Sequence, residues 1–161
     1  MSTGHDLMGR VLKCHLIIEH YLDRFLAAKH HIDNIEDARL TFSQKAKLLP
    51  NAGSAVSFVK PGILKLNAIR NRFGHRLEAH VEVAELGPIN EVLKVARPGV
   101  DFVSGIERIE AFTTVACTWL LVNKVQIQRG QYNTKYKGVI QSYNTYKYIR
   151  RGQVLVLHFT G

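Results

Sequence analysis

The chain of 161 residues contains only two cysteines, Cys14 and Cys117. Each lies in an apolar helical pattern, where a reduced thiol behaves as a small hydrophobic side chain. So few ligands exclude a disulfide framework and a zinc site, and we expect buried free thiols. No apolar run approaches the length of about 18 residues that crosses a membrane, and the amino terminus lacks the pattern of a secretory signal. We therefore expect a cytoplasmic protein with no membrane partner.

Acidic residues are absent from the last third of the chain. All 13 acidic residues lie at or before Glu110, whereas seven of the 22 basic residues follow it. Residues 1–110 hold 15 basic and 13 acidic residues, a net charge of +2, and residues 111–161 carry +7. Such a basic segment attracts polyanions such as nucleic acid, and it is equally typical of a solubilising tail.

Apolar residues recur every three or four positions in three long stretches, which is the helical period. A shorter stretch, TFSQKAKLL, has Thr41 or Ser43 as a helix cap and ends before Pro50. The predicted helices span residues 6–29, 41–49, 63–85 and 102–125. The sequence therefore predicts an all-α protein, a bundle of helices.

The boundaries of these helices follow from proline and glycine. Residues 50–62 hold two prolines and two glycines, and we expect a loop there. Gly87 and Pro88 are expected to end the helix over 63–85. Leu12 and Leu16 widen the apolar surface of the first helix, which is expected to contact neighbours on more than one side.

The residues after Gln128 differ in character from the rest of the chain. Residues 129–161 hold five of the six tyrosines, no acidic residue and a weak alternation over 154–159. A hairpin, a pair of strands, a loosely held tail and a non-native extension all fit this pattern. Tyrosines interleaved with lysines can stack on bases or cover the helical body. We therefore divide the chain into a helical domain, 1–128, and a basic extension, 129–161.

The helix predicted over 63–85 carries an unusual set of polar residues. Its apolar stripe consists of Leu66, Ile69, Phe73, Leu77 and Ala84. At about 100° per residue, a polar band lies opposite this stripe, with Arg70 at its flank. The band consists of Asn67, Asn71, His75, Glu78 and Glu82.

Asn71 and His75 are one turn apart, so the amide can hydrogen-bond the imidazole, which titrates near neutrality. The guanidinium of Arg70 fits phosphate oxygens. Together these residues suit cleavage of RNA by its own 2′-hydroxyl, which requires no metal or other cofactor. A solvated helix face carries the same residue types.

The stretch LNAIRNRFGHRL resembles the signature helix of the HEPN superfamily, whose motif of arginine, a polar residue and histidine matches Arg70, Asn71 and His75. HLIIEHYLDRFL (15–26) is similar to the first helix of the family, and FSQKAKLL (42–49) resembles a helix of its mannitol-repressor-like members. The resemblance implies a HEPN-like bundle of four to five helices that dimerises, so that two motif helices form a composite cleft. His75 would then be the general acid and base, Arg70 the phosphate contact and Asn71 the residue that orients the histidine.

The function implied by this resemblance is a metal-independent endoribonuclease, a toxin or defence effector, with a homodimer, RNA and an antitoxin protein as partners. A subgroup of the family has a tyrosine two residues after the histidine, where this chain has Leu77. The alternatives are a non-catalytic regulatory module and a plain helical adaptor. Possible supporting residues are Glu19, Asp23, Asn67 and Glu78. Expected nucleic-acid contacts are Arg72, Arg76, Lys135, Lys137, Lys147, Arg150 and Arg151.

Overall fold

The protein folds as a bundle of helices. The computed structural model describes residues 4–75, 80–130, 145–150 and 153–158, with the backbone alone for His5, His75 and every residue after Val122. The elements are α1 (Gly4–His30), η1 (Ile35–Ala38), α2 (Phe42–Lys47), α3 (Ala55–His75), η2 (Val83–Leu86), α4 (Gly87–Ala96), α5 (Gly105–Gly130), β1 (Thr145–Arg150) and β2 (Gln153–His158), where η marks a 3₁₀ helix. The expected all-α fold is confirmed.

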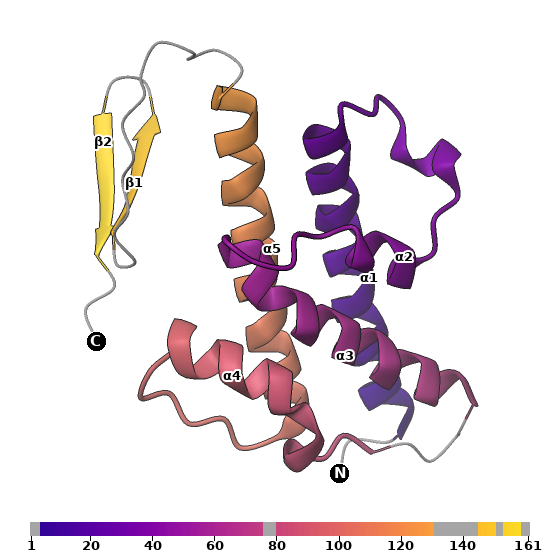
Figure 1. Ribbon diagram of the computed structural model, residues 1–161. Coiled ribbons are helices and arrows are strands. Elements are labelled where there is room, and N and C mark those ends of the chain that lie inside the picture. The colour runs from indigo at the N-terminus through magenta and orange to yellow at the C-terminus, as the bar shows by residue number, and fades with distance from the viewer. Residues whose placement is uncertain (1–3, 76–79, 131–144, 151–152, 159–161) are drawn as a thin grey trace.

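The two long helices, α1 and α5, pack side by side (Figure 1). Helix α3 crosses both of them, α4 packs against α3 and α5, and the short α2 lies against α1 and α3. The buried side chains of these helices form one continuous core. Strands β1 and β2 pair antiparallel, with Thr145 opposite His158 and Arg150 opposite Gln153.

Helix α1 buries the apolar stripe that the sequence predicts. Val11, Ile18 and Leu22 are almost fully buried, and burial of such a side chain stabilises a fold by roughly 1.5–3 kcal/mol. The helix contacts α5, α3 and α2, so the expectation of neighbours on more than one side is confirmed. Leu12 and Leu16 nevertheless remain 38% and 55% exposed. Within the described residues, the apolar surface of α1 is therefore wider than its neighbours cover.

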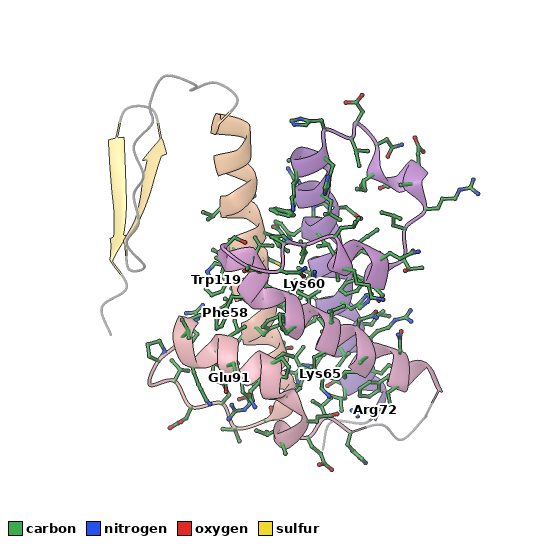
Figure 2. All side chains as sticks on the ribbon, in the orientation of Figure 1. Phe58, Lys60, Lys65, Arg72, Glu91 and Trp119 are labelled. Carbon is green, nitrogen blue, oxygen red and sulfur yellow. The ribbon has the colours of Figure 1, made fainter. Side chains whose placement is uncertain are left out.

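Helix α2 is short, and side chains satisfy the backbone at both of its ends. Thr41 is the N-cap: its hydroxyl accepts from Gln44 N at 3.3 Å, while Gln44 Oε1 accepts from Thr41 N at 2.8 Å. At the other end Lys60 Nζ, labelled in Figure 2, donates to the carbonyls of Lys47 and Leu49 at 2.8 and 2.7 Å. These contacts replace the hydrogen bonds that a helix end leaves unmade, and they fix α2 against α3.

Helix α3 starts earlier than the sequence predicts. The expected loop over 50–62 is wrong in its second half, because the helix begins at Ala55 and contains Pro61. Ser54 and Ser57 exchange hydrogen bonds between backbone N–H and side-chain oxygen at 3.2 and 3.3 Å, which starts the helix. Pro61 is exposed, so its ring points away from the core and costs one backbone hydrogen bond. Gly62 faces α5 so closely that a Cβ there would lie 2.5 Å from the ring of Phe112.

The chain between His75 and Gly105 differs most from the prediction. The helix expected to reach Glu85 is wrong at that end, since residues 80–82 have no helical assignment and Ala84 is exposed in η2. Gly87 and Pro88, read as a stop signal, begin α4 instead. Proline is favoured in the first turn of a helix, where its missing N–H has no partner to lose.

Helix α5 begins three residues later than predicted. The hydroxyl of Ser104 caps the helix by accepting a hydrogen bond from Glu107 N at 3.3 Å. The first residue, Gly105, lies so close to the backbone of Val81 that a Cβ would be 2.6 Å from its carbonyl oxygen. This close approach holds the segment before η2 against the start of α5.

Candidate functional site

The candidate site lies on the carboxy-terminal half of α3. Arg70 and Asn71 are both exposed there, and Arg70 Nη1 donates to Asn71 Oδ1 at 3.3 Å. Among the described side chains, no carboxylate lies within ion-pair distance of Arg70. His75 is the last residue of α3, and its side chain lies outside the described residues. The backbone therefore keeps the three motif residues on one helix, as the sequence predicts.

A buried histidine of α1 faces this part of α3. His15 is 6% exposed, and its Nε2 lies 3.1 Å from Asn67 Oδ1. Its ring stacks on Phe42 of α2, with ring centroids 3.9 Å apart. Burial lowers the pKa of His15, the hydrogen bond with Asn67 and the charge of Glu19 oppose this, and the charges of Arg70 and Lys45 make smaller contributions that lower it. The ring is therefore held neutral at neutral pH.

A buried lysine bridges two carboxylates close to this histidine. Lys45 of α2 is 7% exposed, and its Nζ lies 3.0 Å from Glu19 Oε1 and 2.8 Å from Asp23 Oδ1. Burial opposes the charge of Lys45, but hydrogen bonds with Asp23 and Glu19 leave its pKa raised. Both carboxylates, predicted as possible supporting residues, therefore stabilise the contact between α1 and α2.

Arg72, predicted as a nucleic-acid contact, is engaged within the protein. Its guanidinium donates to both carboxylate oxygens of Glu85 at 2.6 Å and to the carbonyl of His80 at 2.6 Å. Lys65 Nζ lies 3.6 Å from the same carboxylate, and both basic residues are labelled on α3 in Figure 2. Hydrogen bonding from Arg72, above all, lowers the pKa of Glu85 to about 2. Arg72 thus anchors η2 to α3.

Several predicted site residues fall outside the described side chains. Arg76 and Glu78 lie outside the described residues, as do Lys135, Lys137 and Arg151, and for Lys147 and Arg150 only the backbone is described. In the described part of the chain no group of three histidine, cysteine or acidic side chains is placed to hold a metal ion. The helices that could be searched include none with the length and apolarity needed to cross a membrane.

An apolar stripe on α1 borders the candidate site. Met8, Leu12 and Leu16 are exposed at intervals of one turn. At about 100° per residue, Met8 and Leu12 lie within about 60° of His15 around the helix. Because His15 contacts Asn67 of α3, Met8 and Leu12 lie on the side of α1 that adjoins the motif half of α3, and Leu16, about 100° from His15, lies further round the helix.

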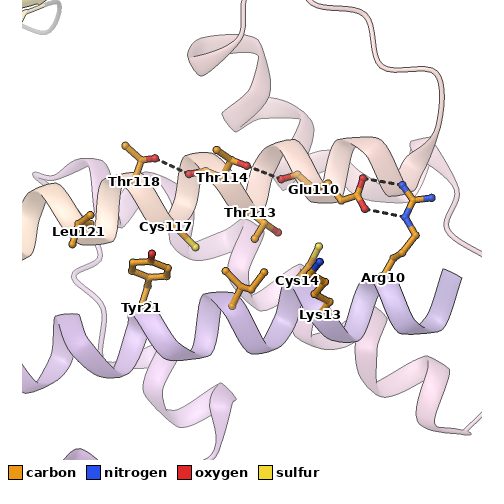
Figure 3. A pocket seen from close by; sticks show the side chains of 11 residues that line it. Arg10, Lys13, Cys14, Tyr21, Glu110, Thr113, Thr114, Cys117, Thr118 and Leu121 are labelled. Atoms are coloured by element: carbon orange, nitrogen blue, oxygen red, sulfur yellow. Dashed lines mark hydrogen bonds and ion pairs between the residues drawn. The ribbon is translucent and has the colours of Figure 1, made fainter. Parts of the chain in front are cut away.

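A separate groove of about 420 Å³ lies between α1 and α5 (Figure 3). Its lining includes Cys14 and Cys117, the two buried free thiols that the sequence predicts. Burial raises the pKa of Cys117 to about 12, so this thiol stays protonated. An ion pair closes one end, where Arg10 donates to the two oxygens of Glu110 at 2.9 and 2.8 Å. Burial also raises the pKa of Cys14, so neither thiol is activated, and the charged groups of Arg10 and Glu110 are engaged with each other.

Sequence reasoning did not identify His15 and Lys45. His15 stands one turn before Glu19, at the boundary between the buried and the polar face of α1, and a histidine at such a boundary is often only half-buried. Lys45 follows Phe42 by three positions and precedes Leu49 by four, which places it on the buried face of its helix. That spacing was a usable signal. No family model matches the chain, and no curated protein and no solved structure is significantly similar to it.

Proposed function

We propose that the protein is a metal-independent endoribonuclease that acts as a homodimer. The observation that carries this proposal is the exposure of Arg70 and Asn71 side by side on α3, one turn before His75, with no described carboxylate on the arginine. A guanidinium without a carboxylate partner is available to a phosphate. The resemblance of this helix to the HEPN motif gives the arrangement its chemical role.

The reaction needs only groups that this chain and the RNA supply. One His75 accepts the proton of the 2′-hydroxyl as the 2′-oxygen attacks phosphorus. The bond from phosphorus to the 5′-oxygen breaks, and the His75 of a second copy donates a proton to that oxygen. Arg70 stabilises the charge that develops on the phosphate oxygens. The products are a 2′,3′-cyclic phosphate and a free 5′-hydroxyl.

The apolar stripe of α1 supports the dimer. Exposed apolar side chains at one-turn intervals, Met8, Leu12 and Leu16, are typical of a helix that packs against a partner. The stripe adjoins the motif half of α3, so a second copy that covers it brings the second motif close to the first. A basic extension, residues 129–161, adds long-range attraction for RNA.

The proposal is tested with purified protein, mixed single-stranded RNA and excess EDTA. We expect cleavage that persists in chelator, leaves a 2′,3′-cyclic phosphate and is lost in His75→Ala. His30→Ala is the matched control, because His30 is an exposed histidine at the end of α1 and should cleave as the parent does. Inert protein at micromolar concentration, or cleavage unchanged in His75→Ala, would refute the proposal. Growth arrest on expression in a bacterial host, relieved by His75→Ala, would support a toxin or defence effector that an antitoxin protein restrains.

A non-catalytic regulatory module is the alternative, and one contact favours it. Arg70 donates to Asn71 Oδ1, so the motif arginine and the motif amide hold each other in the described structure. A motif that only stabilises an interface would use such a contact. If Arg70→Ala and His75→Ala weaken the dimer and leave RNA intact in every variant, this alternative replaces the first.

A further inference from the structure

The contact between α1 and α3 orients one more polar side chain beside Arg70. Asn67 stands three positions before Arg70 and four positions before Asn71. The three side chains therefore lie at neighbouring positions on one face of the helix. Asn67 is half-buried, and among the described residues its side chain has a hydrogen bond to His15 alone. The amide is thus held at one oxygen, while its nitrogen has no described partner.

The buried position of His15 permits one arrangement of this contact. A carbonyl oxygen only accepts, so His15 Nε2 must carry the hydrogen that lies between it and Asn67 Oδ1, 3.1 Å away. In the neutral ring Nδ1 is then bare, and it is buried without a partner in the described part of the chain. The reversed amide, with Nδ2 donating to a bare Nε2, would instead leave an Nδ1–H buried without a described partner, which costs more than a bare nitrogen there. Asn67 Oδ1 is therefore pinned toward α1, and the amide nitrogen takes the opposite branch of the side chain.

The charges around Asn67 suit an anion. An amide whose oxygen is engaged offers only N–H donors, and phosphate oxygens only accept. Lys45 offsets one of the two negative charges of Glu19 and Asp23 that would repel a phosphate, and Arg70 offsets the other. Arg70 stands one turn away without a described carboxylate.

We infer that Asn67 Nδ2 donates a hydrogen bond to an RNA phosphate next to the one that Arg70 binds, and that His15 is its positioning residue. This inference rests on the proposed function, because it assigns Asn67 to the same RNA site. The role of Asn67 differs from the roles of His75 and Arg70, because the Asn67 contact strengthens RNA binding and takes no part in bond cleavage.

The first experiment replaces the amide nitrogen with oxygen. Asn67→Asp keeps the acceptor for His15 and exchanges the N–H donors for a second carboxylate oxygen. Asn51→Asp is the matched control, because Asn51 Oδ1 also accepts from a side chain, Lys60 Nζ at 2.7 Å, and stands on the exposed loop after α2. The probe is a 2′-O-methyl single-stranded RNA oligonucleotide, which cannot be cleaved. We expect Asn67→Asp to weaken its binding about 10- to 100-fold, and Asn51→Asp to stay within about twofold.

The second experiment separates positioning from folding. His15→Gln retains an N–H donor for Asn67, whereas His15→Met fills the same space without one. We expect His15→Met to raise KM for unmodified RNA about tenfold at nearly unchanged kcat, and His15→Gln to recover most of the loss. A urea midpoint measured for both variants shows whether they fold equally well, which a comparison of KM requires.

The outcomes keep this inference apart from the proposed function. If Asn67→Asp binds the probe as Asn51→Asp does, the inference is overturned, and cleavage that is lost in His75→Ala leaves the proposed function standing. Equal KM in His15→Gln and His15→Met overturns the positioning role. If the parent protein binds the probe but cleaves no RNA, the Asn67 result still decides the phosphate contact. A parent protein that binds no RNA overturns both.

Discussion

Replacing Glu85 with glutamine tests the contact that fixes the chain after α3. Both oxygens of this carboxylate accept from Arg72 at 2.6 Å, and the Glu85 side chain is 19% exposed. Hydrogen bonding from Arg72, with smaller contributions from Glu82 N–H and Lys65, lowers its pKa from 4.5 to about 2. Glutamine keeps the size of the side chain and removes the charge.

The size and direction of the effect follow from that pKa. The pKa of Glu85 is lower in the folded protein than in the unfolded chain, so the unfolded chain binds a proton there more readily. The free energy of unfolding therefore decreases as the pH is lowered from about 4.5 to about 2. A shift of this size corresponds to at most about 3.4 kcal/mol, and partial contact with water reduces it to about 2 kcal/mol. Above pH 5 the ion pair contributes fully, and below pH 2 it contributes nothing.

The assay is urea unfolding of the parent protein and Glu85→Gln at pH 6, 4 and 3. We expect Glu85→Gln to be about 2 kcal/mol less stable at pH 6, with the difference shrinking as the pH falls. Glu91→Gln is the control, because Glu91 pairs with Lys94 at 2.7 Å but is 63% exposed, and an exposed pair contributes little. Parallel curves for the parent and Glu85→Gln across this range would refute the reasoning.

Three further substitutions test the packing and the dimer. Lys45→Met leaves two carboxylates without their cation and should lower stability by about 2–4 kcal/mol in urea unfolding; a loss below about 1 kcal/mol would contradict a buried ion pair. Gly62→Ala places a methyl against an aromatic ring of α5 and should cost about 1–3 kcal/mol in the same assay, whereas Gly9→Ala, with nothing within 4 Å, should be neutral or stabilising. If the protein forms the proposed dimer, Leu16→Glu should convert it to monomer in light scattering, while Val95→Glu, at an exposed position on α4, should not; a dimer mass retained in Leu16→Glu would remove this face from the proposed dimer.

The helices could be predicted where the apolar pattern and the caps agree. Helix α1 and the body of α5 have long apolar stripes, and the Thr41 cap marks α2 from its sequence. The helix boundaries were predicted wrongly where the same residue type can either end one helix or begin the next. Pro88 stops a helix that precedes it and favours a helix that follows, and only the burial of the next turn, Ile89 to Leu93, decides between them.

The candidate site could be predicted only in part, because its supporting contacts are not local. The motif on α3 is contiguous, so its residue types and spacing can be read from the chain. Lys45 reaches two carboxylates 22 and 26 residues away, and His15 reaches Asn67 across 52 residues. Helical period places such residues on a face of their own helix, but it does not say which helix lies opposite.

The local charge around Arg70 differs from what the net charge of residues 1–110 suggests. Residues 1–110 carry a net charge of only +2, which by itself predicts little affinity for RNA. The carboxylates nearest α3 are nevertheless bound to buried or half-buried cations: Lys45 holds two of them, and Arg72 holds Glu85. Lys45 offsets one of its two carboxylates, and Arg72 together with Lys65 exceeds the single charge of Glu85, so among the described side chains these two clusters roughly cancel each other and Arg70 adds a positive charge. Within the described residues, a phosphate that approaches this face meets one guanidinium that pairs with no carboxylate, which is the condition that a phosphate-binding arginine requires.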